Sequence, residues 1–188
     1  EHLAGLGHRR IVALMRETTD DDAHARQDQA HELLRAADDL GVDVLVRQVP
    51  EAALAGAGIV GADGLIEGCS AVLSNNPAAV VGLSCAAQAH GLSVPADLSV
   101  LTLGITQDSG RQGEAFSELS VDREAMGAEA GSLLLARLRG EPNPAQHLRL
   151  MPAVLTDRGS TARRRADGMD AGQPLRQRTE GVNMPGRV

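Results

Sequence analysis

Short apolar runs that alternate with amphipathic, helix-length segments constrain the fold of this 188-residue chain more than any other feature. The runs are too short for helices and show no helical period, so each predicts a buried strand. The predicted strands are Ile11–Met15, Val42–Val49, Ala71–Ser74, Leu98–Leu103, Leu119–Val121 and Leu148–Leu155. Strands that alternate with helices indicate an α/β fold built on a parallel sheet.

The helices between these strands are predicted from apolar spacing and from residues typical of helix ends. Between Ala23 and Leu40 the apolar residues recur every three or four positions and form one buried face. Asn76 and Pro77 supply an N-cap and a favoured first residue for a helix that ends near His90. Further helical segments are predicted at 1–7 and 122–138, and a weak helix with loops at 50–68.

Charge divides the chain into an acidic domain and a basic tail. Residues 1–158 carry 12 arginines against 22 acidic residues, whereas residues 159–188 carry six arginines against three. An acidic domain is poorly suited to bind phosphate backbones, which argues against direct nucleic-acid binding. We therefore expect a sensor-like domain over 1–158 and a disordered tail over 159–188.

Composition also excludes several classes of protein. The longest apolar runs, such as Ala78–Leu83, are too short to span a membrane, and no signal segment opens the sequence, so a cytoplasmic location is expected. Cys69 and Cys85 form neither a disulfide framework nor a zinc-binding spacing. No metal and no cofactor are expected.

Three motifs resemble enzyme signatures without meeting their requirements. Gly56–Gly61 spells GxGxxG, but Pro50–Ala55 separates it from the preceding strand, whereas a dinucleotide-binding loop follows its strand directly. His24 and His31 lie two helical turns apart, which is too far for one zinc ion. Ser84 falls short of a nucleophile elbow and lies inside a predicted helix. Since no catalytic residues emerge, a hydrolase or a nucleotide-dependent enzyme ranks last among the functions considered.

Ligands of open α/β sheets bind beyond the carboxyl ends of the strands. In this chain that edge is formed by three segments, namely 16–26, 74–77 and 104–108. A small-molecule site is therefore expected where these segments meet.

Five phrases, in order and with natural spacings, resemble the effector-binding core of the LacI/GalR family of bacterial transcriptional repressors. They are His2-Leu3 with Leu6-Gly7-His8-Arg9-Arg10-Ile11; Asn75-Asn76 with Gly82; Gly91-Leu92 with Val94-Pro95-Ala96-Asp97-Leu98-Ser99-Val100; Leu119-Ser120-Val121 with Met126-Gly127, Leu134 and Arg137-Leu138; and Pro152 with Arg158-Gly159-Ser160-Thr161. The resemblance covers residues 2–161. It implies a periplasmic-binding-protein-like fold, represented here by the C-terminal subdomain and parts of the N-terminal subdomain, without a helix-turn-helix.

The resemblance also implies which residues contact the effector. Arg26 matches a family arginine, and either Asn75 or Asn76 matches a ligand-binding asparagine, the other being the N-cap of the helix. After Gly104 the family has an aromatic residue and then an acid, whereas this chain has Ile105, Thr106 and Gln107, with Asp108 as the nearest acid. The candidate effector-binding residues are therefore Arg26, Asn75, Asn76, Thr106 and Asp108.

The family usually dimerises through the helix that corresponds to 77–90, where small side chains permit close approach. Candidate interface residues are Ala78, Ala79, Ser84 and Ala87. The leading interpretation is thus the ligand-sensing, homodimeric domain of a LacI/GalR-type regulator, which binds a sugar or other metabolite and contacts DNA only through a domain outside this chain. The alternatives are a solute-binding protein of a sugar transporter and a degenerate fragment that binds no ligand.

Overall fold

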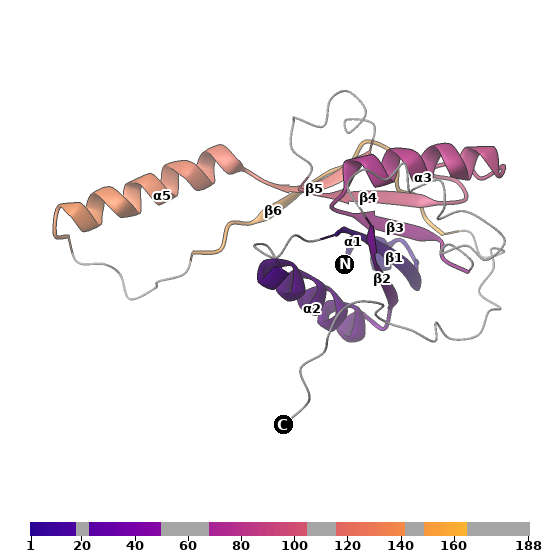
Figure 1. Ribbon diagram of the computed structural model, residues 1–188, viewed down its shortest axis with the longest axis horizontal. Coiled ribbons are helices and arrows are strands. Elements are labelled where there is room, and N and C mark those ends of the chain that lie inside the picture. Colours follow the sequence, from indigo (N-terminus) through magenta and orange to yellow (C-terminus); the bar gives the residue numbers. More distant parts are fainter. Residues whose placement is uncertain (18–22, 50–67, 105–115, 142–148, 165–188) are drawn as a thin grey trace.

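A single six-stranded sheet with helices on both faces organises the protein (Figure 1), as seen in a computed structural model that describes residues 1–17, 23–49, 68–104, 116–141 and 149–164. The strands are β1 Arg10–Arg16, β2 Asp43–Val49, β3 Ala71–Ser74, β4 Ser99–Leu103, β5 Ser117–Val121 and β6 Ala153–Thr156. The helices are α1 His2–Gly5, α2 Ala23–Leu40, α3 Pro77–Ala89 and α5 Arg123–Leu138. The predicted α/β class is confirmed.

The strand order is β2-β1-β3-β4-β5-β6, with β1 to β5 parallel and β6 antiparallel to β5. β5 begins at Ser117, two residues before its predicted start, and β6 begins at Ala153 rather than Leu148. β6 is antiparallel because the chain turns back along β5 after α5, which places Leu155 opposite Leu119. The weak helix predicted at 50–68 lies outside the described residues, apart from Gly68.

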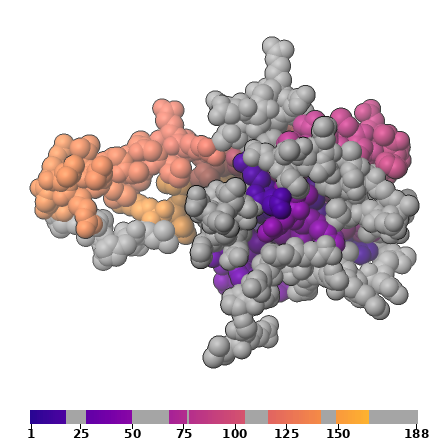
Figure 2. Space-filling view, viewed as in Figure 1, coloured from indigo at the N-terminus to yellow at the C-terminus, as the bar shows by residue number. Residues whose placement is uncertain are grey.

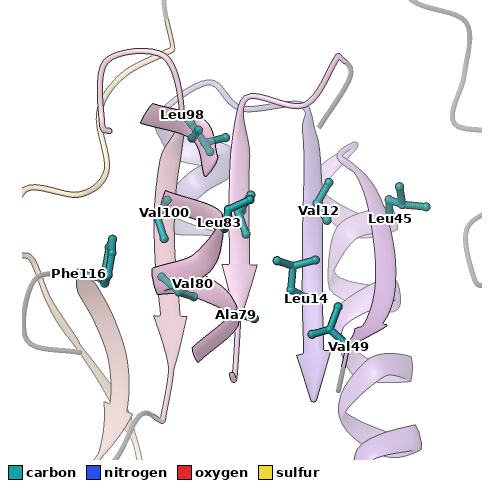
Figure 3. Close-up of a cluster of buried hydrophobic side chains, with 12 residues drawn as sticks. Val12, Leu14, Leu45, Val49, Ala79, Val80, Leu83, Leu98, Val100 and Phe116 are labelled. Carbon is teal, nitrogen blue, oxygen red and sulfur yellow. The ribbon is translucent and has the colours of Figure 1, made fainter. Parts of the chain in front are cut away.

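Alternating side chains of the strands divide the core into two layers. Val12 and Leu14 of β1 face α3 and pack with Leu83, as Figure 3 shows. Ile11 and Ala13 of the same strand face the opposite layer, which contains α1 and α2. Because both faces of the sheet are covered, β1 is apolar along its whole centre, as expected for a parallel strand.

Helix α5 has no buried residue, and neither has strand β6, which follows it. It stands away from the body of the molecule at the end of the β5–β6 ribbon (Figures 1 and 2). Asp122 caps its first turn, with its Oδ1 accepting a hydrogen bond from the Ala125 N–H at 2.9 Å. Local sequence signals, rather than packing against the described body of the protein, therefore define the helix.

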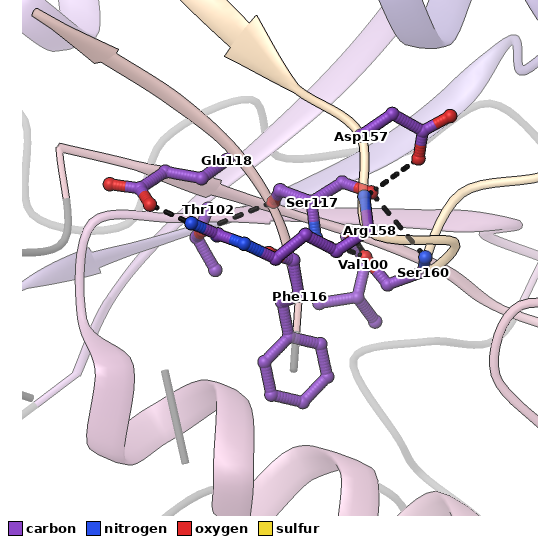
Figure 4. A network of polar contacts seen from close by, with 8 residues as sticks. All are labelled: Val100, Thr102, Phe116, Ser117, Glu118, Asp157, Arg158 and Ser160. Atoms are coloured by element: carbon purple, nitrogen blue, oxygen red, sulfur yellow. Dashed lines mark hydrogen bonds and ion pairs between the residues drawn. The ribbon is translucent and has the colours of Figure 1, made fainter. Parts of the chain in front are cut away.

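Beyond β6, the chain returns to the sheet through a buried polar network around Ser117 and Ser160 (Figure 4). The Ser160 hydroxyl donates to the Val100 carbonyl oxygen and accepts from the Ser117 N–H, each at 2.6 Å. The Ser117 hydroxyl donates to Asp157 Oδ1 at 2.9 Å and accepts from the Arg158 N–H at 3.0 Å. These bonds satisfy polar groups that would otherwise be buried without partners.

Arg158 adds two further bonds, which join the chain after β6 to strand β5 and to the residue before it. Its Nη1 donates to the Phe116 carbonyl oxygen at 2.8 Å and to Glu118 Oε2 at 3.1 Å, and the Glu118 side chain is only 11% exposed. Beyond the predicted domain boundary at 158 the chain stays bonded to the sheet, because the Val100 N–H donates to the Ser160 carbonyl oxygen at 2.8 Å and the Ala162 N–H donates to the Ser99 hydroxyl at 3.0 Å. Residues 165–188 of the predicted tail lie outside the described residues.

His8 holds the last described residues at the amino edge of the sheet. Its Nε2 donates to the Ala162 carbonyl oxygen at 3.0 Å, so its Nδ1 accepts from the Ser70 hydroxyl at 2.8 Å when the ring is neutral. Burial lowers the pKa of His8 from its usual value, and the nearby Arg164 and His2 lower it further, while the bond to Ala162 opposes the shift. The folded protein therefore favours the uncharged ring.

We expect acidification to destabilise the protein through His8. The unfolded chain binds a proton at a higher pH than the folded one, so the free energy of unfolding falls as the pH drops below the unfolded value of about 6.5. Urea unfolding at pH 7.5 and pH 5.0 measures this loss. His8→Gln should reduce the difference between the free energies of unfolding measured at the two pH values, because glutamine does not titrate. If the difference is unchanged, other groups cause the acid sensitivity.

Among the described residues, no helix has both the length and the apolar character needed to cross a bilayer.

Candidate functional site

The carboxyl ends of β1 to β5 lie together at one edge of the sheet because these strands are parallel. The described residues at this edge include Arg16 at the end of β1, Ser74 at the end of β3 and Gly104 just after β4. Ligands of open α/β sheets bind beyond such an edge. We therefore ask which of the effector-binding residues predicted from sequence lie at this edge.

Asn75 lies at this edge and joins β1 to α2. Its Oδ1 accepts a hydrogen bond from the Arg16 N–H at 2.8 Å, and its Nδ2 donates to Gln29 Oε1 at 3.2 Å. The residue is half-buried, so part of its amide group faces outward. An amide so placed has a fixed orientation and can present a donor and an acceptor to a bound molecule.

Asn76 has a different environment, although it is the next residue. It is fully buried, and its Oδ1 accepts from the Ala79 N–H at 3.3 Å as the N-cap of α3. The neighbouring Ser74 is also fully buried, and its hydroxyl donates to the Leu14 carbonyl oxygen at 2.7 Å. The sequence left open which of the two asparagines caps the helix. The cap of α3 is Asn76, and Asn75 is the one whose side chain stays partly exposed.

For the other predicted effector-binding residues, the structure describes only the backbone position of Arg26. Arg26 belongs to the first turns of α2, one turn before Gln29, so the backbone brings it to the helix end nearest this edge. Thr106 and Asp108 lie outside the described residues. The structure therefore brings Asn75 together with Gln29 of α2, and the contributions of Arg26, Thr106 and Asp108 to the site stay predictions.

The sequence analysis did not identify Gln29 as part of this edge. The residue is exposed on α2, and only its bond to Asn75 distinguishes it from other surface glutamines. The one indication in the sequence was that Gln29 lies one helical turn after Arg26, which places both residues on the same side of α2. A contact between residues 46 positions apart in the sequence cannot be read from local pattern.

The four residues predicted for a dimer interface do not share one surface. Ala79 and Ala87 are fully buried against the sheet, and Ser84 is half-buried, with its hydroxyl donating to the Val80 carbonyl oxygen at 2.9 Å. Ala78 is exposed, as is Cys85 on the outer side of the helix. A partner that binds α3 would therefore contact the exposed residues Ala78 and Cys85. Ala79 and Ala87 are part of the core and are not accessible to a partner.

Within the described ranges, no group of three or more histidine, cysteine, aspartate or glutamate side chains is arranged to hold a metal ion.

Comparison with known proteins identifies the fold. The family model of the periplasmic binding protein-like domain matches residues 1–161. No curated protein matches the chain. Among solved structures, a LacI family transcriptional regulator from Bifidobacterium animalis subsp. lactis is similar, with 22% identity, a TM-score of 0.65, and coverage of 86% of this chain and 58% of that one.

Two other structures lead to the same fold. A LacI-family transcriptional regulatory protein from Corynebacterium glutamicum is 24% identical, with a TM-score of 0.64 and coverage of 87% of this chain and 62% of that one. The Lac repressor dimer bound to operator and the anti-inducer ONPF is 25% identical, with a TM-score of 0.63 and coverage of 86% and 55%. This chain thus spans less than two thirds of the length of each. It belongs to the family of periplasmic binding protein-like domains, in the form that LacI-family transcriptional regulators contain.

Proposed function

We propose that this chain is the ligand-sensing, dimerising part of a LacI/GalR-type transcriptional regulator, which binds a small polar metabolite at the carboxyl edge of its sheet. The observation that carries the proposal is the position of Asn75. Its amide is fixed by Arg16 and Gln29, stays partly exposed, and lies at the edge where open α/β sheets bind ligands.

The chemistry of the proposed site suits binding rather than catalysis. A fixed amide offers one donor and one acceptor direction, and the guanidinium group of Arg26 would add donors suited to hydroxyl or carboxylate oxygens. Thr106 and Asp108, which follow β4 in the sequence, would complete the set. A polar metabolite such as a sugar or a carboxylic acid fits this combination of hydrogen-bonding groups. The proposed role is binding alone, without a chemical reaction.

Regulation would follow from a change of conformation on binding. One similar structure is described as a repressor dimer bound to operator and anti-inducer. We propose by analogy that two copies of this chain associate, with α3 contributing Ala78 and its outer side, and that the ligand favours one arrangement of the dimer. DNA contact would come from a separate domain, and the protein would act in the cytoplasm.

A thermal-shift screen of sugars, purines and carboxylates against the full chain tests the proposal. A ligand at one hundred times its dissociation constant stabilises a protein by about 2.7 kcal/mol, which raises the melting temperature by several degrees. Asn75→Ala and Arg26→Ala should each lose most of this ligand-dependent rise, measured from their own ligand-free melting temperatures.

Arg35→Ala is the matched control. Arg35 lies on the same helix as Arg26, and its side chain is 75% exposed and forms an ion pair with Glu32 at the surface. The control should keep the full ligand response, since an exposed pair of this kind contributes little stability. If Asn75→Ala and Arg26→Ala respond as strongly as Arg35→Ala, the site is elsewhere.

A further inference from the structure

The hydrogen bonds of Asn75 fix the direction in which two side-chain amides point. The Arg16 backbone N–H can only donate, so the Asn75 atom that lies 2.8 Å from it must be the oxygen, Oδ1. Asn75 Nδ2 is therefore the atom that faces Gln29. Because this nitrogen also only donates, the Gln29 atom at 3.2 Å must be the oxygen, Oε1. A single backbone N–H thus determines the orientation of both amides.

Both amides consequently offer N–H groups to a ligand. The bond between them uses one of the two hydrogens of Asn75 Nδ2 and the oxygen of Gln29, which leaves Gln29 Nε2 out of the bond. Gln29 is exposed and Asn75 is half-buried, so the other amide hydrogens face a molecule bound at this edge of the sheet. We call the two residues the donor pair, since each amide oxygen already accepts a bond within the protein.

The donor pair favours a carboxylate over a sugar hydroxyl. A carboxylate only accepts hydrogen bonds and has two oxygens, so it can take N–H groups from both amides at once. A hydroxyl accepts through one oxygen but also carries a proton that needs an acceptor, and the oxygens of the donor pair are engaged. Hydrogen bonds to an ionised acceptor are also roughly twice as strong as neutral ones.

The start of α3 gives the same preference. The helix begins at Pro77, two residues after Asn75, and the helix dipole places partial positive charge at that end. Arg16 and Glu17, which follow one another at the end of β1, cancel in formal charge. The preference for an anion therefore comes from the amides of the donor pair and from the helix end.

We propose that Gln29 is a ligand-binding residue and that Gln29 and Asn75 together bind a carboxylate group of the effector. The inference rests on the proposed function, since it assigns the ligand class of the same site. It makes the effector an organic acid, such as a uronic or hydroxy acid, rather than an uncharged sugar. Gln29 sets this specificity because its amide cannot turn its oxygen toward the ligand without losing the bond from Asn75.

Matched ligand pairs, titrated against the full chain with the melting temperature as readout, test the assignment. The probes are D-glucuronate, D-galacturonate, D-gluconate and L-lactate, each measured beside its neutral amide, which has nearly the same size. At least one acid should raise the melting temperature by several degrees at saturating concentration. Its amide should bind roughly tenfold more weakly, because a neutral acceptor replaces an ionised one.

Variants of Gln29 separate its role from that of Asn75. Gln29→Glu keeps an acceptor for Asn75 Nδ2 but replaces the outward N–H groups by a negative charge, so it should weaken binding of the acid about a hundredfold. Gln29→Ala removes the donors without adding charge and should weaken binding about tenfold. Gln88→Glu is the matched control, because it makes the same substitution at an exposed position near the other end of α3 and should keep full affinity.

Each contrary result has a distinct meaning. If a neutral amide or an uncharged sugar binds at least as tightly as every acid, and Asn75→Ala removes this binding, the proposed site stands and the ligand class is wrong. If an acid binds through Asn75 but Gln29→Glu leaves its affinity unchanged, Gln29 is not a ligand-binding residue. If no compound binds, or if Asn75→Ala has no effect on binding, the proposed function fails and the inference fails with it.

Discussion

Replacing Leu83 by alanine should lower the free energy of unfolding by about 3 to 4 kcal/mol, a large share of the stability of a domain of this size. The Leu83 side chain is fully buried on the inner side of α3, where it packs in one cluster with Val12, Leu14 and Val72. Alanine keeps the helix propensity, so the loss comes from the removed apolar contacts and from the cavity that they leave. Urea unfolding followed by circular dichroism measures the change.

Leu134→Ala is the matched control, since it is the same substitution at a position of α5 that is 60% exposed. It should change the free energy of unfolding by less than about 0.5 kcal/mol, as is usual for surface positions. Equal losses for the two variants would mean that α3 does not cover the sheet as described.

Ser160→Ala should cost about 2 kcal/mol, because it leaves a buried donor without a partner. The Ser160 hydroxyl is the acceptor for the Ser117 N–H and the donor to the Val100 carbonyl oxygen, and the residue is only 3% exposed. Both partners lie in strands and cannot turn toward water. Ser160→Ala should also increase the hydrogen exchange of 157–164, since these residues are fixed to the sheet by the same network.

Ser132→Ala removes a hydroxyl from the exposed surface of α5 and should leave stability unchanged within about 0.5 kcal/mol. If Ser160→Ala is as stable as this control, the network around Ser117 does not hold the returning chain.

Local pattern was sufficient to predict most of the fold. The helix predicted over 23–40 matches α2 at both ends, and the Asn76-Pro77 pair correctly marks the start of α3. These elements were predictable because capping residues and apolar spacing act within a few positions of the chain. The strand predicted at 148–155 was too long, because apolar residues such as Leu150 lie outside β6, where local pattern does not show whether they pair.

The site was less predictable than the fold because it depends on contacts between distant segments. Sequence could not decide between Asn75 and Asn76; the difference in their burial, which follows from the packing of α3 on the sheet, separates their roles. Sequence likewise did not indicate that Ala79 and Ala87 face the core, since small side chains suit a helix interface and a tightly packed sheet equally well.

The central claim, that a small polar ligand binds at the carboxyl edge of the sheet, is tested most directly by amide chemical shifts. The ¹⁵N-labelled chain is titrated with the compound that most raises the melting temperature. The account predicts that the largest shifts fall on Arg16, Asn75 and Gly104. Shifts concentrated at the opposite edge, around His8 and Ser70, would contradict it.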